Sequence, residues 1–384
     1  MKDPLEGQET MHRVWRGLGM LLLWLAFVTL LLQGAGYVLF NHTGFRAFAE
    51  YGYPTGIYVS HPRLGFIYAP GFSGHFYGAA YQHIPIEINA HGFRDKPFQS
   101  KRPPTARVLM VGDSVVFGAG VAAQARFTAL LDAAWQPGAE MLNLGVNAYT
   151  FGHYVTLAEL DFLGLQPDYV LLGFTLNDIK APGDDMGRGR LEQYGVGARP
   201  DWYITMERAA RTSYAWRFVQ EVWLRVRLGM MSAQASAEYH TRWMHSVVDF
   251  WKRDVERARL EEEVKRWQAL LAARSVPFGI VLFPELNALR GPQEFGYPRQ
   301  AARALFERLR VAYCDPYARF AGQADLPALF LANDGVHYSP AGHALIGEAV
   351  RECAVRGLLP GAPGSPAQSS AGRGAVAAGT PLVR

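Results

Sequence analysis

Two short motifs, far apart in the chain, carry side chains that acyl-transfer chemistry needs. Gly112-Asp113-Ser114 places a serine hydroxyl directly after a short apolar run. Asp334 and His337 lie three residues apart near the end of the chain. A nucleophilic serine needs a base that takes its proton and a carboxylate that orients this base. We therefore predict Ser114 as the nucleophile, His337 as its base and Asp334 as the orienting acid.

Two further motifs offer hydrogen-bond donors for an oxyanion. Gly145 ends a second apolar run, where a glycine lets a backbone N–H point into a site. Asn177 follows a third run, and its side-chain amide can also donate. Ester cleavage needs such donors aimed at the tetrahedral oxygen. Gly and Asn are also common turn residues at the ends of strands. Because the motifs occur in order along the chain, we predict an oxyanion hole formed by Ser114, Gly145 and Asn177.

These motifs need elements that bring them together. Short apolar runs typical of buried strands occur at 107–111, 140–143, 168–174, 278–283 and 311–314. Segments with helical character separate or follow them at 122–134, 152–163, 254–273 and 340–356. Strands that alternate with helices predict a parallel sheet with helices on both faces. Ligand sites of such sheets lie beyond the carboxyl ends of the strands. Within 254–273, four apolar residues recur at helical spacing, and we predict that they face the core: Leu260, Val264, Trp267 and Leu271.

The motifs together resemble those of the SGNH (GDSL-like) hydrolase family over about residues 105–352. Ser114 matches the serine of the family's first block, Gly145 the glycine of the second, and Asn177 the asparagine of the third. Asp334 and His337 match the final Asp-x-x-His. The resemblance implies a three-layer α/β/α fold with a flavodoxin-like, five-stranded parallel sheet.

Two details refine this resemblance. Asn89-Ala-His-Gly-Phe-Arg-Asp95 precedes the domain, as a similar segment does in the bacterial membrane-anchored branch. The third block departs from the family pattern, because Thr175 stands where a glycine is usual, before Asn177 and Asp178. We therefore expect the backbone of that loop to differ in detail from the family pattern, while Asn177 keeps its predicted role.

The N-terminal part of the chain predicts a membrane anchor. Residues 17–45 contain no Asp, Glu, Lys or Arg, and a helix needs about 20 apolar residues to cross the hydrocarbon core. Arg13 and Arg16 precede the apolar run and only Arg46 follows it closely. The positive-inside rule then predicts one span at 17–40, with residues 1–16 cytoplasmic. The catalytic domain is accordingly expected on the extracytoplasmic, periplasmic side. A cleaved signal peptide is the alternative, but it needs a shorter apolar core and a small-x-small cleavage site.

The rest of the chain divides by composition. Residues 46–100 read as loops and short strands that lead into a hydrolase-like domain at 101–356. A Trp- and Arg-rich stretch at 180–252 interrupts that domain, and it is too long for a structureless loop. We predict a helical insertion, which can be a lid, an amphipathic element on the membrane, or a packed appendage. Residues 357–384 are rich in Gly, Ala, Pro and Ser and predict a disordered tail.

Composition limits the partners. The net charge of +4 comes without a basic stripe, so nucleic acid is not an expected partner. No Cys/His cluster has zinc spacing, and we expect neither metal nor other cofactor. Cys314 and Cys353 can be two buried thiols or, outside the cytoplasm, one disulfide.

The sequence as a whole indicates a serine esterase that hydrolyses O-acyl esters, with an envelope glycan or lipid as the ester-bearing substrate. The same triad can instead pass the acyl group to a glycan, as an O-acyltransferase. A third hypothesis, of another class, is a non-catalytic envelope scaffold that binds through the aromatic insertion.

Overall fold

The structure is a computed structural model that describes residues 4–42, 56–76, 84–160, 162–182, 202, 206, 213–227, 233–331 and 334–366. The chain forms two compact units. The first contains Met1–Glu50 and Pro200–Met231, and the second contains Tyr51–Arg199 and Ser232–Arg384.

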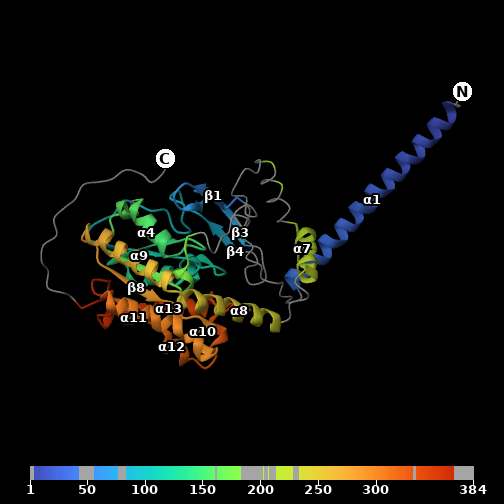
Figure 1. Cartoon of the computed structure of the whole chain (residues 1–384). Coiled ribbons are helices and arrows are strands. Elements are labelled where there is room, and N and C mark those ends of the chain that lie inside the picture. Colours follow the sequence, from blue (N-terminus) through green and yellow to red (C-terminus); the bar gives the residue numbers. More distant parts are fainter. Residues whose placement is uncertain are drawn as a thin grey trace. The chain divides into compact units, whose positions relative to one another are not determined.

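A five-stranded parallel sheet forms the centre of the second unit (Figure 1). Its strands lie in the order β6-β5-β7-β8-β9. The edge strand β6 follows β5 in the chain and lies beside it, and the other three strands lie on the opposite side of β5. This order confirms the predicted flavodoxin-like arrangement. The strands are β5 (Ala106–Gly112), β6 (Ala139–Gly145), β7 (Tyr169–Phe174), β8 (Phe278–Leu282) and β9 (Tyr313–Cys314).

Both faces of the sheet are buried. Successive residues of a strand point to opposite faces, so each strand contributes to two hydrophobic clusters. In β5, Leu109 and Val111 belong to one hydrophobic cluster, and Val108 and Met110 belong to the other. The helices on the first face are α4 (Phe151–Glu159), α8 (Ala233–Lys252), α9 (Asp254–Ala272) and α11 (Tyr297–Arg308). On the second face lie α3 (Phe127–Trp135) and α13 (Pro340–Val355). Two covered faces explain why the strands are apolar without alternation.

Short helices connect these elements. The α-helical ones are α2 (Ser114–Phe117), α10 (Leu286–Arg290) and α12 (Tyr317–Ala321). The 3₁₀ turns are η1 (Ala123–Ala125), η2 (Phe162–Leu165), η3 (Leu176–Ile179), η4 (Gln293–Gly296) and η5 (Pro327–Leu329).

The segment before the sheet is part of the same core. Two antiparallel hairpins precede β5, made of β1 (Tyr58–His61) with β2 (Gly65–Tyr68) and of β3 (Ser73–Phe76) with β4 (Ile84–Glu87). Tyr58, Phe66 and Tyr68 of the first hairpin and Ile86 of the second belong to the first hydrophobic cluster. This cluster also contains residues of the central sheet. The hairpins before the sheet therefore pack against the same core as the sheet.

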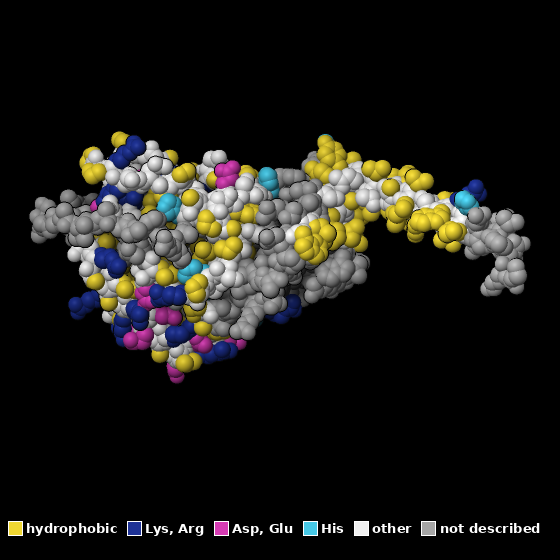
Figure 2. All heavy atoms as spheres, turned by 90° about the horizontal axis from the view of Figure 1, so that it is seen from above, with side chains coloured by type: hydrophobic (Ala, Val, Ile, Leu, Met, Phe, Trp, Pro, Cys, Tyr) yellow, Lys and Arg dark blue, Asp and Glu magenta, His cyan; other side chains and the backbone are white. Residues whose placement is uncertain are grey.

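The first unit contains two described helices, α1 (Pro4–His42) and α7 (Tyr214–Arg227). Met11–Leu39 of α1 is long and apolar enough to cross a membrane, and a signal sequence near the N-terminus has the same properties. Figure 2 shows hydrophobic side chains along α1, with basic and histidine side chains near its N-terminal end. The predicted insertion at 180–252 therefore contains α7 in this unit and α8 in the other.

The start of the C-terminal tail differs from the prediction. Leu359 is fully buried, and Leu359 and Ala362 belong to the second hydrophobic cluster. The prediction that disorder begins at residue 357 is thus wrong for the first residues of the tail, because they cover apolar surface of the domain. Residues 367–384 lie outside the described residues.

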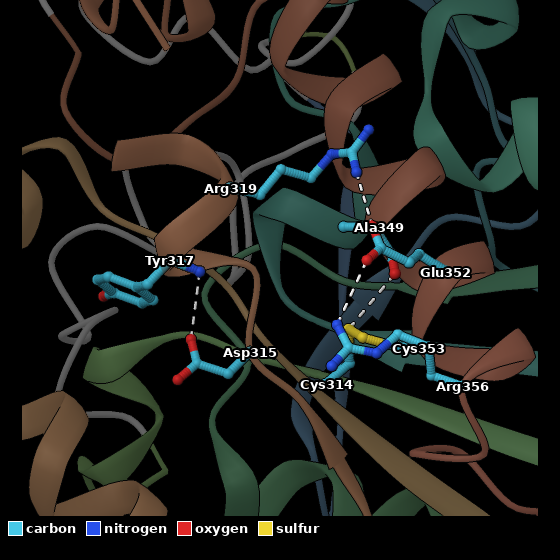
Figure 3. The surroundings of a disulfide bond; sticks show 8 residues. All are labelled: Cys314, Asp315, Tyr317, Arg319, Ala349, Glu352, Cys353 and Arg356. Carbon is cyan, nitrogen blue, oxygen red and sulfur yellow. Dashed lines mark hydrogen bonds and ion pairs between the residues drawn. A yellow bond between two sulfur atoms is a disulfide. The ribbon is translucent and has the colours of Figure 1, made fainter. Parts of the chain in front are cut away.

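A disulfide joins Cys314 at the end of β9 to Cys353 in α13 (Figure 3). This resolves the alternative left open by the sequence, since neither cysteine is a free thiol. Beside it, Arg319 forms ion pairs with Glu348 and Glu352 of the same helix. The bond closes a loop over a sequence separation of 39 residues that contains both Asp334 and His337.

Replacing both cysteines by alanine should lower the free energy of unfolding by about 4 kcal/mol, because a cross-link over a loop of this length restricts the unfolded chain. Urea unfolding of the detergent-solubilised protein measures the change. Reducing agent should destabilise the wild type and leave the double variant unaffected. Equal stability of the oxidised wild type and the double variant would contradict this role of the bond.

Candidate active site

The serine lies where β5 gives way to a helix. Asp113 caps α2, and its Oδ1 accepts the Val115 N–H at 2.9 Å. Ser114 is the first residue of this helix, where backbone N–H groups have no partner within the helix. The side chain of Ser114 is 8% exposed. The hydroxyl is therefore held at the carboxyl edge of the sheet by a capped turn.

The loop before α13 holds the acid and the base. The Leu331 N–H donates to the His337 carbonyl at 2.9 Å, and the Ser339 N–H donates to the Leu329 carbonyl at 2.9 Å. Ser339 then caps α13, because its Oγ accepts the Gly342 N–H at 3.3 Å. These hydrogen bonds hold both ends of the loop, and they therefore fix the backbone that carries the His337 side chain.

The structure brings together the three residues predicted as a triad. His337 Nε2 lies 2.8 Å from Ser114 Oγ. His337 Nδ1 lies 2.7 Å from Asp334 Oδ2, and Asp334 Oδ1 accepts the backbone N–H groups of Val336 and His337 at 2.9 and 3.0 Å. All three side chains are buried. The imidazole is thus placed between a hydroxyl and a carboxylate, with the carboxylate itself fixed by two amides.

Burial and charge oppose each other in this trio. Burial lowers the pKa of His337, but the Asp334 carboxylate outweighs it, with smaller contributions from Asp113 and Glu285. The net pKa of His337 lies above its ordinary value. Burial raises the pKa of Asp334, but His337 and the two backbone amides hold that pKa below its ordinary value. The pair therefore favours an ionised Asp334 and stabilises a positive charge on His337.

Thr175 links the serine loop to the loop that carries Asn177. Its Oγ lies 2.9 Å from Asp113 Oδ2 and 3.2 Å from Asp178 Oδ1. One hydroxyl proton cannot serve both carboxyls. Burial, and then the nearby Asp113, raise the pKa of Asp178 well above its ordinary value, which favours its protonated form. The threonine that departs from the family pattern thus bridges the side chains of Asp113 and Asp178.

Glu285 is a further buried acid at the same edge, which the sequence interpretation missed. Its Oε1 accepts the Leu176 N–H at 3.0 Å, next to Asn177. The following residue, Leu286, donates its N–H to the Gly335 carbonyl at 2.8 Å, within the loop of the acid and the base. Burial raises the pKa of Glu285 to about 8. An acid three residues after the end of β8 was a usable sign, because the carboxyl ends of parallel strands share one sheet edge.

Gly145, which the sequence predicts as an oxyanion donor, lies at the end of β6 beside α2. Its N–H donates to Asn143 Oδ1 at 2.8 Å, so this amide already has a partner in the structure. An added Cβ at Gly145 would lie 2.2 Å from the Phe117 backbone nitrogen. The glycine is needed because α2 packs directly against the end of β6.

The segment around Arg94 secures the serine helix from outside the sheet. The buried Arg94 guanidinium donates to the carbonyls of Gly118 at 2.7 Å and Val121 at 2.9 Å, which follow α2. Asp95 Oδ2 accepts the Asn143 N–H at 2.7 Å. The motif noticed before the domain therefore connects the loop after α2 with β6.

No group of three His, Cys, Asp or Glu among the described residues is placed to hold a metal ion. The buried carboxyls near Ser114 instead find hydroxyl and amide donors, as set out above for Asp113, Asp178 and Glu285.

Comparison with known proteins gives a family match. The sequence profile of the GDSL-like Lipase/Acylhydrolase family matches residues 110–345. Among curated proteins, no relative matches the chain. The matched segment contains Ser114, Gly145, Asn177, Asp334 and His337.

Several solved structures are similar at low identity. TesA is 13% identical, with 66% of this chain and 99% of that chain covered and a TM-score of 0.39. The lipase/acylhydrolase from Enterococcus faecalis is 13% identical, with 65% and 95% covered and a TM-score of 0.37. A catalytic mutant of an acetylxylan esterase from Geobacillus stearothermophilus is 15% identical, with 66% and 95% covered and a TM-score of 0.36.

Thr175→Val should lower the free energy of unfolding by about 2 kcal/mol, because it leaves two buried carboxyls without the hydroxyl between them. Thr175→Ser keeps the hydroxyl and removes one methyl group, which should cost about 0.8 kcal/mol. Urea unfolding of the two variants at neutral pH measures the difference. A valine variant as stable as the serine variant would show that the bridge contributes nothing.

Proposed function

Because the chain belongs to the GDSL-like lipase/acylhydrolase family, we propose that this SGNH-type serine hydrolase cleaves carboxylic esters through Ser114, His337 and Asp334. One observation carries the proposal. The Ser114 hydroxyl lies 2.8 Å from His337 Nε2, within reach of direct proton transfer. The other ring nitrogen of His337 faces Asp334 at 2.7 Å.

The reaction proceeds in two steps. Ser114 Oγ attacks the ester carbonyl carbon while His337 Nε2 takes the hydroxyl proton. The tetrahedral intermediate collapses, and the alcohol leaves with that proton. Water then attacks the acyl-serine, with His337 again as base, and the carboxylic acid departs. Asp334 fixes the ring tautomer and stabilises the imidazolium in both steps.

The oxyanion of each tetrahedral intermediate needs donors near Ser114. We assign the Ser114 N–H, at the start of α2, and the Asn177 side-chain amide to this role. The Gly145 N–H joins them only if it exchanges its hydrogen bond with Asn143 Oδ1. Ala148 is another candidate of the same loop. It has a left-handed φ of 60°, and its N–H has no hydrogen-bond partner within the described part of the chain.

The substrate is proposed from location. Arg13 and Arg16 before the apolar part of α1 support a hydrolase domain outside the cytoplasm, because the positive-inside rule favours a cytoplasmic N-terminus. The Cys314–Cys353 disulfide fits an oxidising compartment. An esterase anchored there meets O-acylated envelope glycans and lipids, and these are the substrate classes we propose.

The purified full-length protein in detergent should hydrolyse short-chain aryl esters, and Ser114→Ala should lower the rate by about 10⁴-fold or more. The matched control is the unfolding curve of both proteins, which should coincide. Equal rates would reject Ser114 as the nucleophile. Recovery of the acyl group on an added sugar, rather than as free acid, would replace hydrolysis by transfer to a glycan.

The pH dependence follows from the base. His337 accepts the serine proton only when it is neutral, and its pKa is raised by Asp334. The value of kcat/KM should therefore rise with pH through an apparent pKa above 6.5, the ordinary value of histidine. Asp334→Asn should move this limb to lower pH and reduce kcat by about 10³–10⁴-fold. An unchanged limb in that variant would contradict the pairing of Asp334 with His337.

A further inference from the structure

The insertion helix α7 is bound to the end of the apolar helix α1. Gln33 Oε1 accepts the Ala215 N–H at 2.8 Å and the Ser213 hydroxyl at 3.0 Å. The rings of Tyr37 and Tyr214 meet edge to face with centroids 5.3 Å apart. Side-chain, ring and backbone contacts thus hold the start of α7 against one turn of α1.

A glycine allows this close approach. A Cβ added at Gly36 would lie 2.7 Å from the Tyr214 carbonyl oxygen. Ala215, the residue that donates to Gln33, is buried. Small residues at a contact let two helix backbones come together inside or beside a membrane.

The contact lies at a definable depth in the proposed membrane span. A helix crosses the hydrocarbon core in about 20 residues, and this count from Gly17, the first residue of the charge-free run, ends near Gly36. Gln33 is then within one turn of the outer boundary. A side-chain amide oxygen at that depth has little water to accept from. The N–H and hydroxyl donors at the start of α7 supply the missing hydrogen bonds.

Three of the described side chains of α7 are large, apolar and exposed. Trp216, Val219 and Val222 are 42%, 46% and 45% exposed. They recur every third residue, so that neighbours in this set are adjacent on the helix surface. Arg217 in contrast is buried, with its guanidinium 5.2 Å from the Tyr214 ring centre. A helix that begins at the membrane boundary and exposes a tryptophan and two valines suits the headgroup region, where such rings and apolar faces insert.

We propose that α7 lies in the outer headgroup layer of the membrane that α1 spans, with Trp216, Val219 and Val222 in contact with lipid. The proposal rests on α1 as a membrane span and is independent of the catalytic residues. It selects one of the three roles that the sequence left open for the insertion.

Single cysteines at Val219 and Val222 of the full-length protein test the proposal, because both native cysteines are disulfide-bonded. Each variant is labelled with an environment-sensitive fluorophore and reconstituted into phosphatidylcholine–phosphatidylglycerol vesicles. The control carries the label at Val355, an exposed valine of α13. Quenching by iodide in water is compared with quenching by lipids brominated high or low on the acyl chain.

Labels at 219 and 222 should show blue-shifted emission and lose most intensity to lipids brominated near the headgroup, since interfacial helices insert about 5–10 Å. The label at 355 should respond to iodide alone. Iodide quenching of 219 and 222 would overturn the proposal, and shielding from both quenchers would overturn it in favour of a protein contact. Carbonate extraction of the same vesicles reports on α1 separately, so failure of the anchor is distinguishable.

Discussion

The hydrogen bond between Ser114 Oγ and His337 Nε2 joins residues that are 223 positions apart in the chain. Such a contact forms only if the strand before Ser114 and the loop before the last helix end at the same edge of the sheet. The parallel order β6-β5-β7-β8-β9 provides this edge, because all carboxyl ends of parallel strands lie there. The disulfide between Cys314 and Cys353 closes the chain around the loop that bears His337.

Charge regulation is the second condition for the site. Several carboxyls are buried near one imidazole, and mutual repulsion would be costly if all were ionised. The groups around each carboxyl determine whether its ionised or its protonated form is favoured. Asp334 stays ionised beside His337 and two amides, while burial and Asp113 favour the protonated form of Asp178. Burial also raises the pKa of Glu285 to about 8. The negative charge is thereby concentrated where an imidazolium has to be stabilised.

The strands and the buried faces of helices could be predicted from the sequence, because they depend on the local pattern of apolar residues. Apolar runs located the strands, and the helical spacing of Leu260 and Val264 predicted the buried face of α9, where both are buried. The contacts of Gly145 and Thr175 could not be predicted, since they depend on which atoms meet across the sheet edge. The Gly145 amide faces Asn143, and Thr175 bridges two acids. Leu359 was assigned to the tail because a Gly- and Pro-rich segment does not reveal that one leucine fills a gap in the core.

Covalent labelling tests the pairing of serine and imidazole most directly. A fluorophosphonate probe reacts with a serine only when a neighbouring base activates it. Applied to the full-length protein and followed by peptide mapping, the probe should modify Ser114 in the wild type, and its rate should fall sharply in His337→Gln. Modification of a different serine, or equal rates in both proteins, would contradict proton transfer from Ser114 to His337.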